Sequence, residues 1–326
     1  MKNVKTGILP VPGANLYYEV RGSGPVLLLI CGGIYDAAGY AGLADRLADR
    51  YTVVTYDRRG NSRSPLDGPP EPQSIAVHAD DAHRLLTAVG VTEDEPACVF
   101  GNSSGAVIGL ELAARHPGRV RAMVAHEPPV FELLPDRDHW RAVARDVADA
   151  FREGGAGQAM GVFAAGMGMG GGDDHGEDAG HGDAGHEDAG HGDAGRGDGG
   201  AQAAPGADGE GAAGPGHGDA APAPQGEPDP ETAEIMARTA ANMEFFIGYE
   251  VPPFSGHTPD LDALRASGVR VVTAVGETSE GEPPHRAALA LAERLDGRPE
   301  VFPGDHGGFG AEAEAFAARL REVLAA

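Results

Sequence analysis

The sequence reads Gly101-Asn102-Ser103-Ser104-Gly105 directly after the apolar run Ala97–Phe100 and directly before a second apolar run, Ala106–Leu112. A strand followed by a sharp turn that opens a helix is the context in which a G-x-S-x-G pattern carries a reactive serine. The flanking glycines allow the strained backbone that lifts the Ser103 hydroxyl clear of the sheet. The turn also aims the backbone N–H of Ser104 and the helix N-terminus at the same point. We therefore predict a nucleophile at Ser103; the alternative is an ordinary glycine-rich turn.

The composition restricts the class of protein. The chain has 326 residues and a formal net charge of −25 at pH 7, which argues against nucleic acid and anionic membranes as partners. Cys31 and Cys98 fall at or near the ends of expected buried strands, so we interpret them as reduced core residues. No apolar segment follows Met1–Lys5, and the longest apolar run, Val26–Cys31, is too short to span a bilayer. We expect a cytoplasmic protein without a signal peptide.

Strand-like and helix-like patterns alternate over residues 1–127 and again after residue 255. The apolar runs expected to form strands are 16–20, 26–30, 51–56, 97–100, 120–125, 269–275 and 299–302. Helical spacing of apolar residues marks 36–49, 74–89, 104–115, 260–266, 283–295 and 311–324. This alternation predicts a mostly parallel sheet flanked by crossover helices.

An insertion, residues 128–255, interrupts the alternation. Its flanks, 136–151 and 230–249, have helical patterns. From about 166 to 226 the chain is mostly Gly, Ala, Asp, His and Pro, with a five-residue repeat such as His181-Gly182-Asp183-Ala184-Gly185. Such a segment has too few large apolar side chains to offset its ordering entropy, so we expect disorder. Weak metal binding by the repeat histidines is conceivable, but we favour a repeat expansion in a tolerant loop.

A serine nucleophile needs a general base. His306 is the best candidate, because it follows the last short strand in the glycine-rich stretch Gly304-Asp305-His306-Gly307-Gly308-Phe309. That loop can carry an imidazole over the edge of the sheet. His126 is the main rival by position, and the alternative for His306 is a loop residue that caps the final helix.

The oxyanion hole needs a second N–H beside that of Ser104. The turn Cys31-Gly32-Gly33-Ile34 ends an expected buried strand, and its glycines allow the backbone to approach a substrate closely. Gly33 is the first candidate and Ile34 the second; the alternative is a plain connection between a strand and a helix.

Four pieces of the chain together resemble the α/β-hydrolase superfamily. They are the Cys31-Gly32-Gly33 turn, the stretch Tyr56–Ser64 (YDRRGNSRS), the Gly101–Gly105 motif and the Gly304–Phe309 loop, in the order and spacing of that fold. The resemblance implies an α/β-hydrolase core formed by residues 1–127 and 256–326. The insertion at 128–255 lies where the family carries its cap, so it implies a helical cap interrupted by the low-complexity segment.

The acid departs from the family pattern. The family's usual acid follows the next-to-last strand, three residues after a glycine, and here that position is Ser279, in Gly276-Glu277-Thr278-Ser279-Glu280. A serine cannot stabilise an imidazolium. Glu280 is one candidate, and a further alternative is that neither glutamate is the acid. Glu127, after the strand that follows the nucleophile, is the other and the preferred one, as in some haloalkane dehalogenases of the superfamily. A charge at the end of a buried strand needs a partner, which is His306 or, alternatively, a nearby arginine.

The resemblance implies a serine hydrolase that cleaves an ester, thioester or lactone of a small molecule through an acyl-enzyme. Ser103, His306 and Glu127 form the expected triad, and the N–H groups of Gly33 and Ser104 form the oxyanion hole. No metal or organic cofactor is needed. A serine nucleophile argues against epoxide hydrolase and dehalogenase chemistry. Perhydrolysis, C–C bond hydrolysis, acyl transfer and a non-catalytic ligand-binding role are the alternatives.

Overall fold

A sheet of eight strands forms the centre of the computed structural model, which describes residues 4–168 and 230–326. The strands are β1 (Lys5–Val11), β2 (Ala14–Gly22), β3 (Val26–Ile30), β4 (Thr52–Tyr56), β5 (Ala97–Asn102), β6 (Val120–His126), β7 (Arg270–Gly276) and β8 (Glu300–Phe302). Their order is β1-β2-β4-β3-β5-β6-β7-β8. Only the pairs β1–β2 and β2–β4 are antiparallel. The expected α/β fold with a mostly parallel sheet is confirmed.

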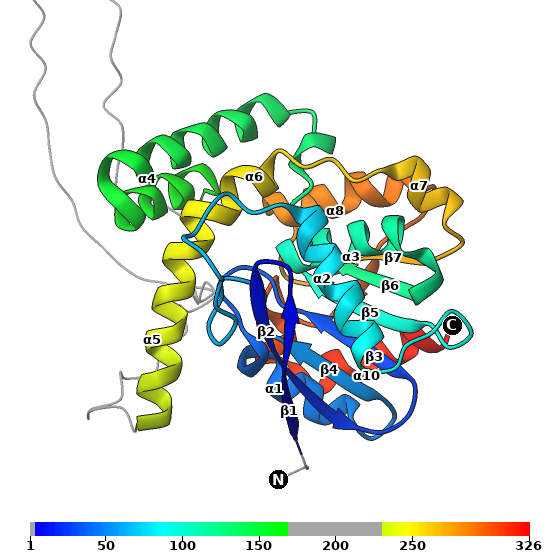
Figure 1. The fold of residues 1–326 in the computed structure, drawn as a ribbon. Coiled ribbons are helices and arrows are strands. Elements are labelled where there is room, and N and C mark those ends of the chain that lie inside the picture. The colour runs from blue at the N-terminus through cyan, green and yellow to red at the C-terminus, as the bar shows by residue number, and fades with distance from the viewer. Residues whose placement is uncertain (1–3, 169–229) are drawn as a thin grey trace, which may run out of the picture. The chain divides into compact units, whose positions relative to one another are not determined.

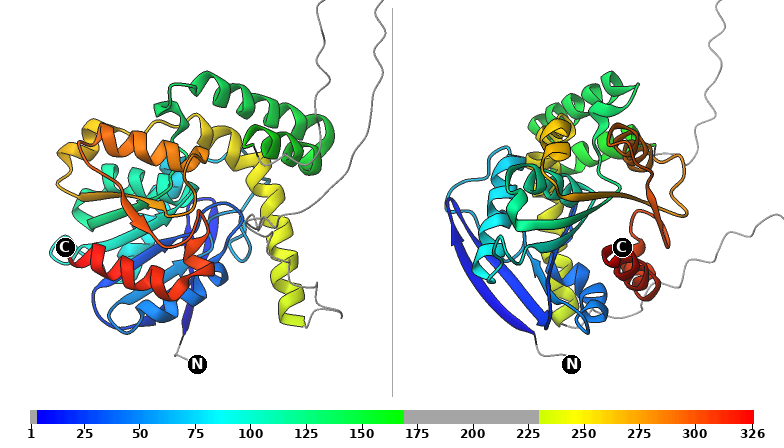
Figure 2. Two further views of the ribbon diagram at one scale, coloured as in Figure 1. Left: turned by 180° about the vertical axis from the view of Figure 1, so that it is seen from behind. Right: turned by 90° about the vertical axis from the view of Figure 1, so that its right-hand side faces the viewer.

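Helices cover both faces of the sheet because the central strands are apolar on both sides. In β3, Leu28 and Ile30 pack with α2 (Ile75–Ala88), α3 (Ser104–Arg115) and α8 (Pro283–Arg294). Leu27 and Leu29 face the other way, toward α1 (Ala41–Leu47) and α10 (Ala313–Ala325). Figures 1 and 2 show α2 and α10 on opposite faces. Alternate residues of one strand therefore supply two separate cores.

Short helices complete the connections at the edges of these layers. They are η1 (Ala37–Tyr40) before α1, η2 (Pro117–Arg119) after α3, α7 (Leu261–Ala266) before β7, and α9 (Gly308–Ala311) before α10. The expected helix at 36–49 is thus split into η1 and α1, and the one at 311–324 is preceded by α9.

Strand β1 is the one element of the sheet that the sequence patterns did not predict. Its residues alternate between exposed and partly buried positions, and it pairs with β2 across a turn at Gly13, where φ is +81°. An edge strand with one solvated face buries too few apolar side chains to produce a clear signal.

The helices between β6 and β7 belong to the same compact unit as the sheet. Besides α7, they are η3 (Phe131–Leu133), α4 (Arg137–Gly166), α5 (Pro230–Phe245), the π-helical segment η4 (Phe246–Glu250) and α6 (Val251–Ser255). We call α4, α5, η4 and α6 the cap helices. The assignment of 128–255 as a separate cap domain stays a prediction, and the expected disorder at 166–226 lies, beyond its first three residues, outside the described part of the chain.

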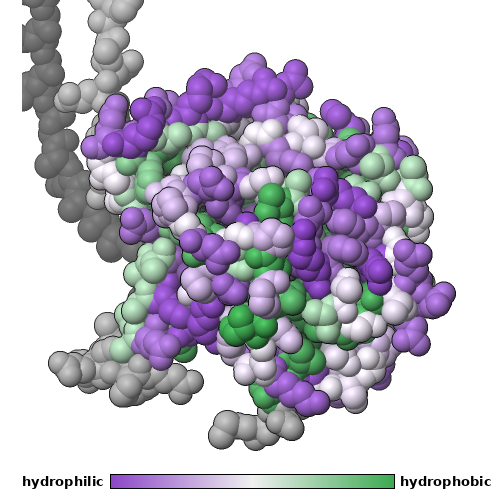
Figure 3. Space-filling view, in the orientation of Figure 1, coloured by the Kyte–Doolittle hydropathy of each residue, from purple (hydrophilic) through white to green (hydrophobic). Residues whose placement is uncertain are grey.

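The cap helices have a small apolar core of their own, which includes Val147, Ala159 and Ile247. Helix α4 kinks at Gly155, whose φ is +74°. Its outward side is mainly hydrophilic (Figure 3). None of the described helices is long and apolar enough to cross a membrane.

Two glycines on either side of Ser103 allow close approach of backbones: Gly101 allows β5 to approach α3, and Gly105 allows α3 to approach the end of β3. A Cβ on Gly101 would lie 2.4 Å from the Gly105 carbonyl oxygen, and a Cβ on Gly105 would lie 2.2 Å from the Ile30 carbonyl oxygen. Both contacts are with backbone, which cannot move aside as a flexible side chain can. The glycines are therefore required by packing as well as by the turn.

We expect Gly105→Ala to lower the free energy of unfolding by about 3 kcal/mol, since the added methyl group overpacks the core against a fixed backbone. The matched control is Gly161→Ala on the exposed side of α4, where a Cβ meets nothing within 4 Å. This control should gain about 0.5–1 kcal/mol of helix stability. Urea unfolding measures both values; equal effects of the two substitutions would contradict the packing argument.

Candidate active site

Ser103 lies at the junction of β5 and α3 with φ 54° and ψ −128°. A positive φ is strained for a residue with a side chain, and such strain persists only where the surrounding structure enforces it. The Ser103 N–H donates to the His126 carbonyl at 2.9 Å, and the Ala106 N–H donates to the Ser103 carbonyl at 2.9 Å. The backbone on both sides is thus fixed, and Ser103 lines a pocket above the strand ends.

His306 and Glu127 are in direct contact. The Nδ1 of His306 lies 2.7 Å from Oε2 of Glu127. Glu127 follows β6 with φ +46° and is fully buried. Its other oxygen, Oε1, accepts a hydrogen bond from the Gly276 N–H at 2.8 Å and another from the Ser279 hydroxyl. The structure therefore brings together the histidine and the preferred acid of the sequence analysis, and the partner of this carboxylate is a histidine rather than an arginine.

The other acid candidate lies elsewhere. Glu280 is exposed, and within residues 4–168 and 230–326 no hydrogen bond or ion pair joins it to His306. Ser279, at the position where the family usually has its acid, is buried and donates to Glu127. His285 lies near the same carboxylate, with Nδ1 3.7 Å from Oε1. The sequence patterns singled out neither the Ser279 nor the His285 contact.

The carboxyl group of Glu127 is held in its ionised form. Burial alone would raise its pKa, but the hydrogen bonds from His306, Ser279 and the Gly276 N–H outweigh burial and lower the pKa from 4.5 to about 2. A carboxylate that stays ionised beside an imidazole can stabilise the imidazolium that forms when the imidazole takes a proton.

His126, the rival base, is enclosed below the pocket. Its side chain is fully buried, and burial lowers its pKa to about 4. Nδ2 of Asn102 lies 3.1 Å from its Nδ1 and also donates to the His306 carbonyl at 3.0 Å. Asn102 therefore ties the end of β5 to the His306 loop, a role that its place in the G-N-S-S-G stretch did not reveal.

The Gly33 turn lies against the nucleophile. A Cβ on Gly32 would lie 2.8 Å from the Ser103 Cβ, so this turn needs glycine. Gly33 has a φ of +54°, and its N–H donates to the Ser104 hydroxyl oxygen at 2.9 Å. Gly33, Ile34 and Ser104 all line the pocket with Ser103. The N–H of the first oxyanion candidate is thus engaged by the Ser104 side chain in this structure.

The pocket has a volume of about 490 Å³. Ser103 and His306 lie in its wall, and much of the remaining wall is apolar and comes from the cap helices: Met160, Phe163, Met243, Phe246, Val251 and Phe254. Among the described residues, no group of three or more His, Cys, Asp or Glu side chains is arranged to hold a metal ion. The repeat histidines considered as weak metal ligands lie outside those residues.

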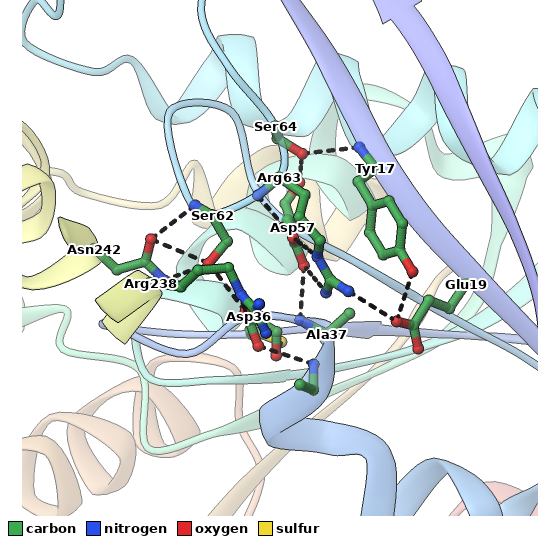
Figure 4. A network of polar contacts seen from close by, with 12 residues as sticks. Tyr17, Glu19, Asp36, Ala37, Asp57, Ser62, Arg63, Ser64, Arg238 and Asn242 are labelled. Atoms are coloured by element: carbon green, nitrogen blue, oxygen red, sulfur yellow. Dashed lines mark hydrogen bonds and ion pairs between the residues drawn. The ribbon is translucent and has the colours of Figure 1, made fainter. Parts of the chain in front are cut away.

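The Tyr56–Ser64 stretch orders the loops beside the pocket (Figure 4). Asp57 is buried and accepts hydrogen bonds from the Ala37 N–H at 2.9 Å and from the Arg63 guanidinium at 2.7 Å. Ser62 contacts Asp36 and the cap residue Asn242. The stretch is therefore structural, and it connects the core to α5.

Comparisons with known proteins identify the family of the chain. A family model described as alpha/beta hydrolase fold matches residues 25–170. The uncharacterized hydrolase YraK of Bacillus subtilis (strain 168) is 32% identical over 98% of this chain and 96% of its own. A thermophilic esterase from Thermogutta terrifontis has a TM-score of 0.63 at 16% identity, covering 98% of each chain. The enol-lactonase from Burkholderia xenovorans LB400 has a TM-score of 0.59 at 15% identity, covering 98% of this chain and 100% of its own.

The chain therefore belongs to the α/β-hydrolase family. Within that family it is a hydrolase, similar in fold to esterases and a lactonase.

The lowered pKa of Glu127 predicts a pH-dependent contribution to stability. A carboxyl group whose pKa is lower in the folded state stabilises fully above its unfolded pKa, near 4.5, and loses that contribution as the pH falls through about 2. The unfolding free energy of wild type minus that of Glu127→Gln should therefore have its full value near pH 5 and shrink by about 3 kcal/mol toward pH 2.

Urea unfolding from pH 2 to 7 measures this difference, with exposed Glu280→Gln as the control whose difference should stay near zero. A Glu127→Gln difference of the same size at pH 3 and pH 6 would rule out an ionised, hydrogen-bonded carboxylate.

Proposed function

We propose that this hydrolase cleaves an ester, thioester or lactone through an acyl-enzyme on Ser103. His306 serves as the general base and acid, and Glu127 holds its imidazolium. The observation that carries the proposal is the 2.7 Å contact between His306 Nδ1 and Glu127 Oε2, with His306 and the strained Ser103 in the wall of one pocket.

The proposed reaction has two halves. In the first, Ser103 Oγ attacks the carbonyl carbon while Nε2 of His306 takes the hydroxyl proton, and the π electrons move to the carbonyl oxygen. When the tetrahedral intermediate collapses, the C–O (or C–S) bond of the substrate breaks, and His306 gives the proton to the leaving group. In the second half, water attacks the acyl-enzyme by the same steps and releases the acid and free Ser103.

The N–H groups of Ser104 and Gly33 are proposed to bind the developing oxyanion. Donors aimed at the position of the developing charge are worth far more inside a dry pocket than in water. The Ser104 side chain must then turn away from the Gly33 N–H when the substrate oxygen arrives. No hydrogen bond joins Ser103 to His306 within the described residues, and catalytic hydrogen bonds of this kind often tighten only when substrate binds.

The pocket wall supports a neutral, apolar substrate group. The wall contains no lysine or arginine among the described residues, and the exposed carboxylate of Glu282 lies at it. Met160, Met167 and Met243 have flexible side chains that adapt to different apolar shapes. All four cap helices contribute to this surface, which supports the proposed role of residues 128–255 as a substrate-binding cap. The two similar structures named above are an esterase and an enol-lactonase.

A fluorophosphonate probe, which reacts only with an activated serine, tests the nucleophile and the acid together. We expect wild type to be labelled, Ser103→Ala to be inert, and His306→Ala to be slowed about 10³-fold or more. Glu127→Gln should be slowed about 10²-fold or more, because the amide cannot stabilise the imidazolium.

The matched control is Glu280→Gln, which should label within about twofold of wild type. A folded wild type that takes up no label would favour the competing hypothesis of a non-catalytic ligand-binding protein. If Glu280→Gln lost labelling while Glu127→Gln kept it, Glu280 rather than Glu127 would be the acid of the triad.

The charge at the pocket predicts selectivity between substrates of similar size. We expect kcat/KM for p-nitrophenyl butyrate to exceed that for p-nitrophenyl hemisuccinate by about tenfold or more, since a second carboxylate loses hydration and meets Glu282. Glu282→Gln should raise the value for the hemisuccinate about threefold and leave that for the butyrate unchanged. Equal values for both esters in wild type would refute an anion-excluding pocket.

A further inference from the structure

Arg58 and Glu250 form an ion pair that is completely buried. Arg58 lies in the loop after β4, and Glu250 is the last residue of η4 in the cap. Their side chains are both 0% exposed, and Arg58 Nη1 lies 2.7 Å from Glu250 Oε1. The Asn61 side-chain amide donates to the same oxygen at 3.1 Å. Burial alone would lower the pKa of Arg58, but the Glu250 carboxylate raises it by more. The net pKa is raised, so the guanidinium stays charged.

Burying such an ion pair makes folding less favourable. Removing two charges from water costs several kcal/mol per ion, and apolar residues of similar size are often as stable. Glu250 Oε2 and Arg58 Nε are also buried, and neither has a hydrogen-bond partner in the described part of the chain. Stability alone therefore does not explain why this pair is present.

The second arm of the guanidinium reaches the oxyanion turn. Arg58 Nη2 donates to the Gly33 carbonyl oxygen. The planar fork of arginine can bind two acceptors in a fixed geometry, which a lysine cannot reproduce. Gly33 has no side chain to anchor it and has a φ of +54°, a region with few steric restraints for glycine. Its position is thus fixed from outside, at the carbonyl by Arg58 and at the N–H by Ser104.

The Ile34 carbonyl, which follows that of Gly33, is held by the cap helix α5. Nδ2 of Asn242, on α5, donates to the Ile34 carbonyl at 2.9 Å. Arg238, one turn earlier on α5, pairs with Asp36 at 3.1 Å. Figure 4 shows Asn242 and Arg238 reaching from α5 toward Ser62 and Asp36. The cap thus supports the turn directly through α5 and indirectly, through Arg58, from η4.

On the function proposed above, we propose that Glu250 and Arg58 are positioning residues that hold the Gly33 carbonyl and thereby aim the Gly33 N–H at the oxyanion. The oxyanion hole of this enzyme is complete only while the cap helices are docked on the core. Neither residue touches the reacting atoms. Their effect is on geometry, and a misplacement of about 1 Å at a catalytic group can cost about 10²-fold in rate.

The test is Glu250→Gln, which keeps the shape of the side chain and removes its charge. We expect kcat on p-nitrophenyl butyrate to fall about 10- to 100-fold with KM within about twofold. The affinity of a boronic acid, which forms a tetrahedral adduct on the serine, should fall by the same factor as kcat/KM. Hydrogen exchange of residues 31–36, followed by mass spectrometry, should become faster.

Two further variants separate positioning from folding. Arg58→Met with Glu250→Leu removes both charges together, so no unpaired ion destabilises the protein, and it should show the same loss of rate and boronate affinity. Asp81→Asn breaks another buried pair, in which Arg59 Nε lies 2.7 Å from Asp81 Oδ2. It should lower Tm but leave kcat, boronate affinity and exchange at 31–36 within twofold of wild type.

The proposal is overturned if Glu250→Gln and the double variant keep kcat and boronate affinity within twofold, or if Asp81→Asn loses them equally. Unchanged exchange at residues 31–36 in Glu250→Gln would overturn it as well. A wild type that cleaves no ester and binds no boronate contradicts the proposed function instead, and in that case the exchange measurement alone still decides whether the pair holds the turn.

Discussion

The buried carboxylate of Glu127 is the interaction on which the arrangement of this site depends. A lone carboxylate at the end of a buried strand would be prohibitively costly, so donors must surround it. They come from the next two strands along the sheet: the Gly276 N–H at the end of β7, the Ser279 hydroxyl in the loop that follows it, and the His306 imidazole in the loop after β8. Satisfying one charge therefore fixes three loops at the carboxyl edge of the sheet, the edge where Ser103 also emerges.

The same carboxylate explains why a serine, Ser279, stands at the position where the family usually has its acid. On the proposed function, Glu127 after β6 is the acid, so the position after β7 needs no charge, and Ser279 there donates a hydrogen bond to Glu127. Strands β6 and β7 are parallel neighbours, so the residues that follow them emerge at the same edge of the sheet. This shared edge brings Glu127 and Ser279 together beside His306.

Residues close together in sequence were the predictable part. The strand, turn and helix around Ser103, the glycine-rich loop of His306 and the alternation that defines the sheet all followed from local patterns. Which of Glu127 and Glu280 contacts His306 depends on the pairing of β6 with β7. The hydrogen bond from the Gly33 N–H to Ser104 depends on how the turn packs against α3. Arg58 and Glu250 are 192 residues apart, and nothing in either neighbourhood indicates the other. Contacts that depend on tertiary structure were therefore beyond local patterns.

The ion pair between core and cap also restricts how this enzyme can diverge. A substitution at residue 58 or 250 alone leaves a buried charge without its partner, so the two positions must change together. The methionines and phenylalanines that line the pocket have no charged partner, so they can be substituted one at a time. Substitutions in the pocket wall can therefore change the substrate preference while the cap stays matched to its own core. A cap transplanted from a relative would bring a new pocket, but the contacts that hold the Gly33 turn would be lost.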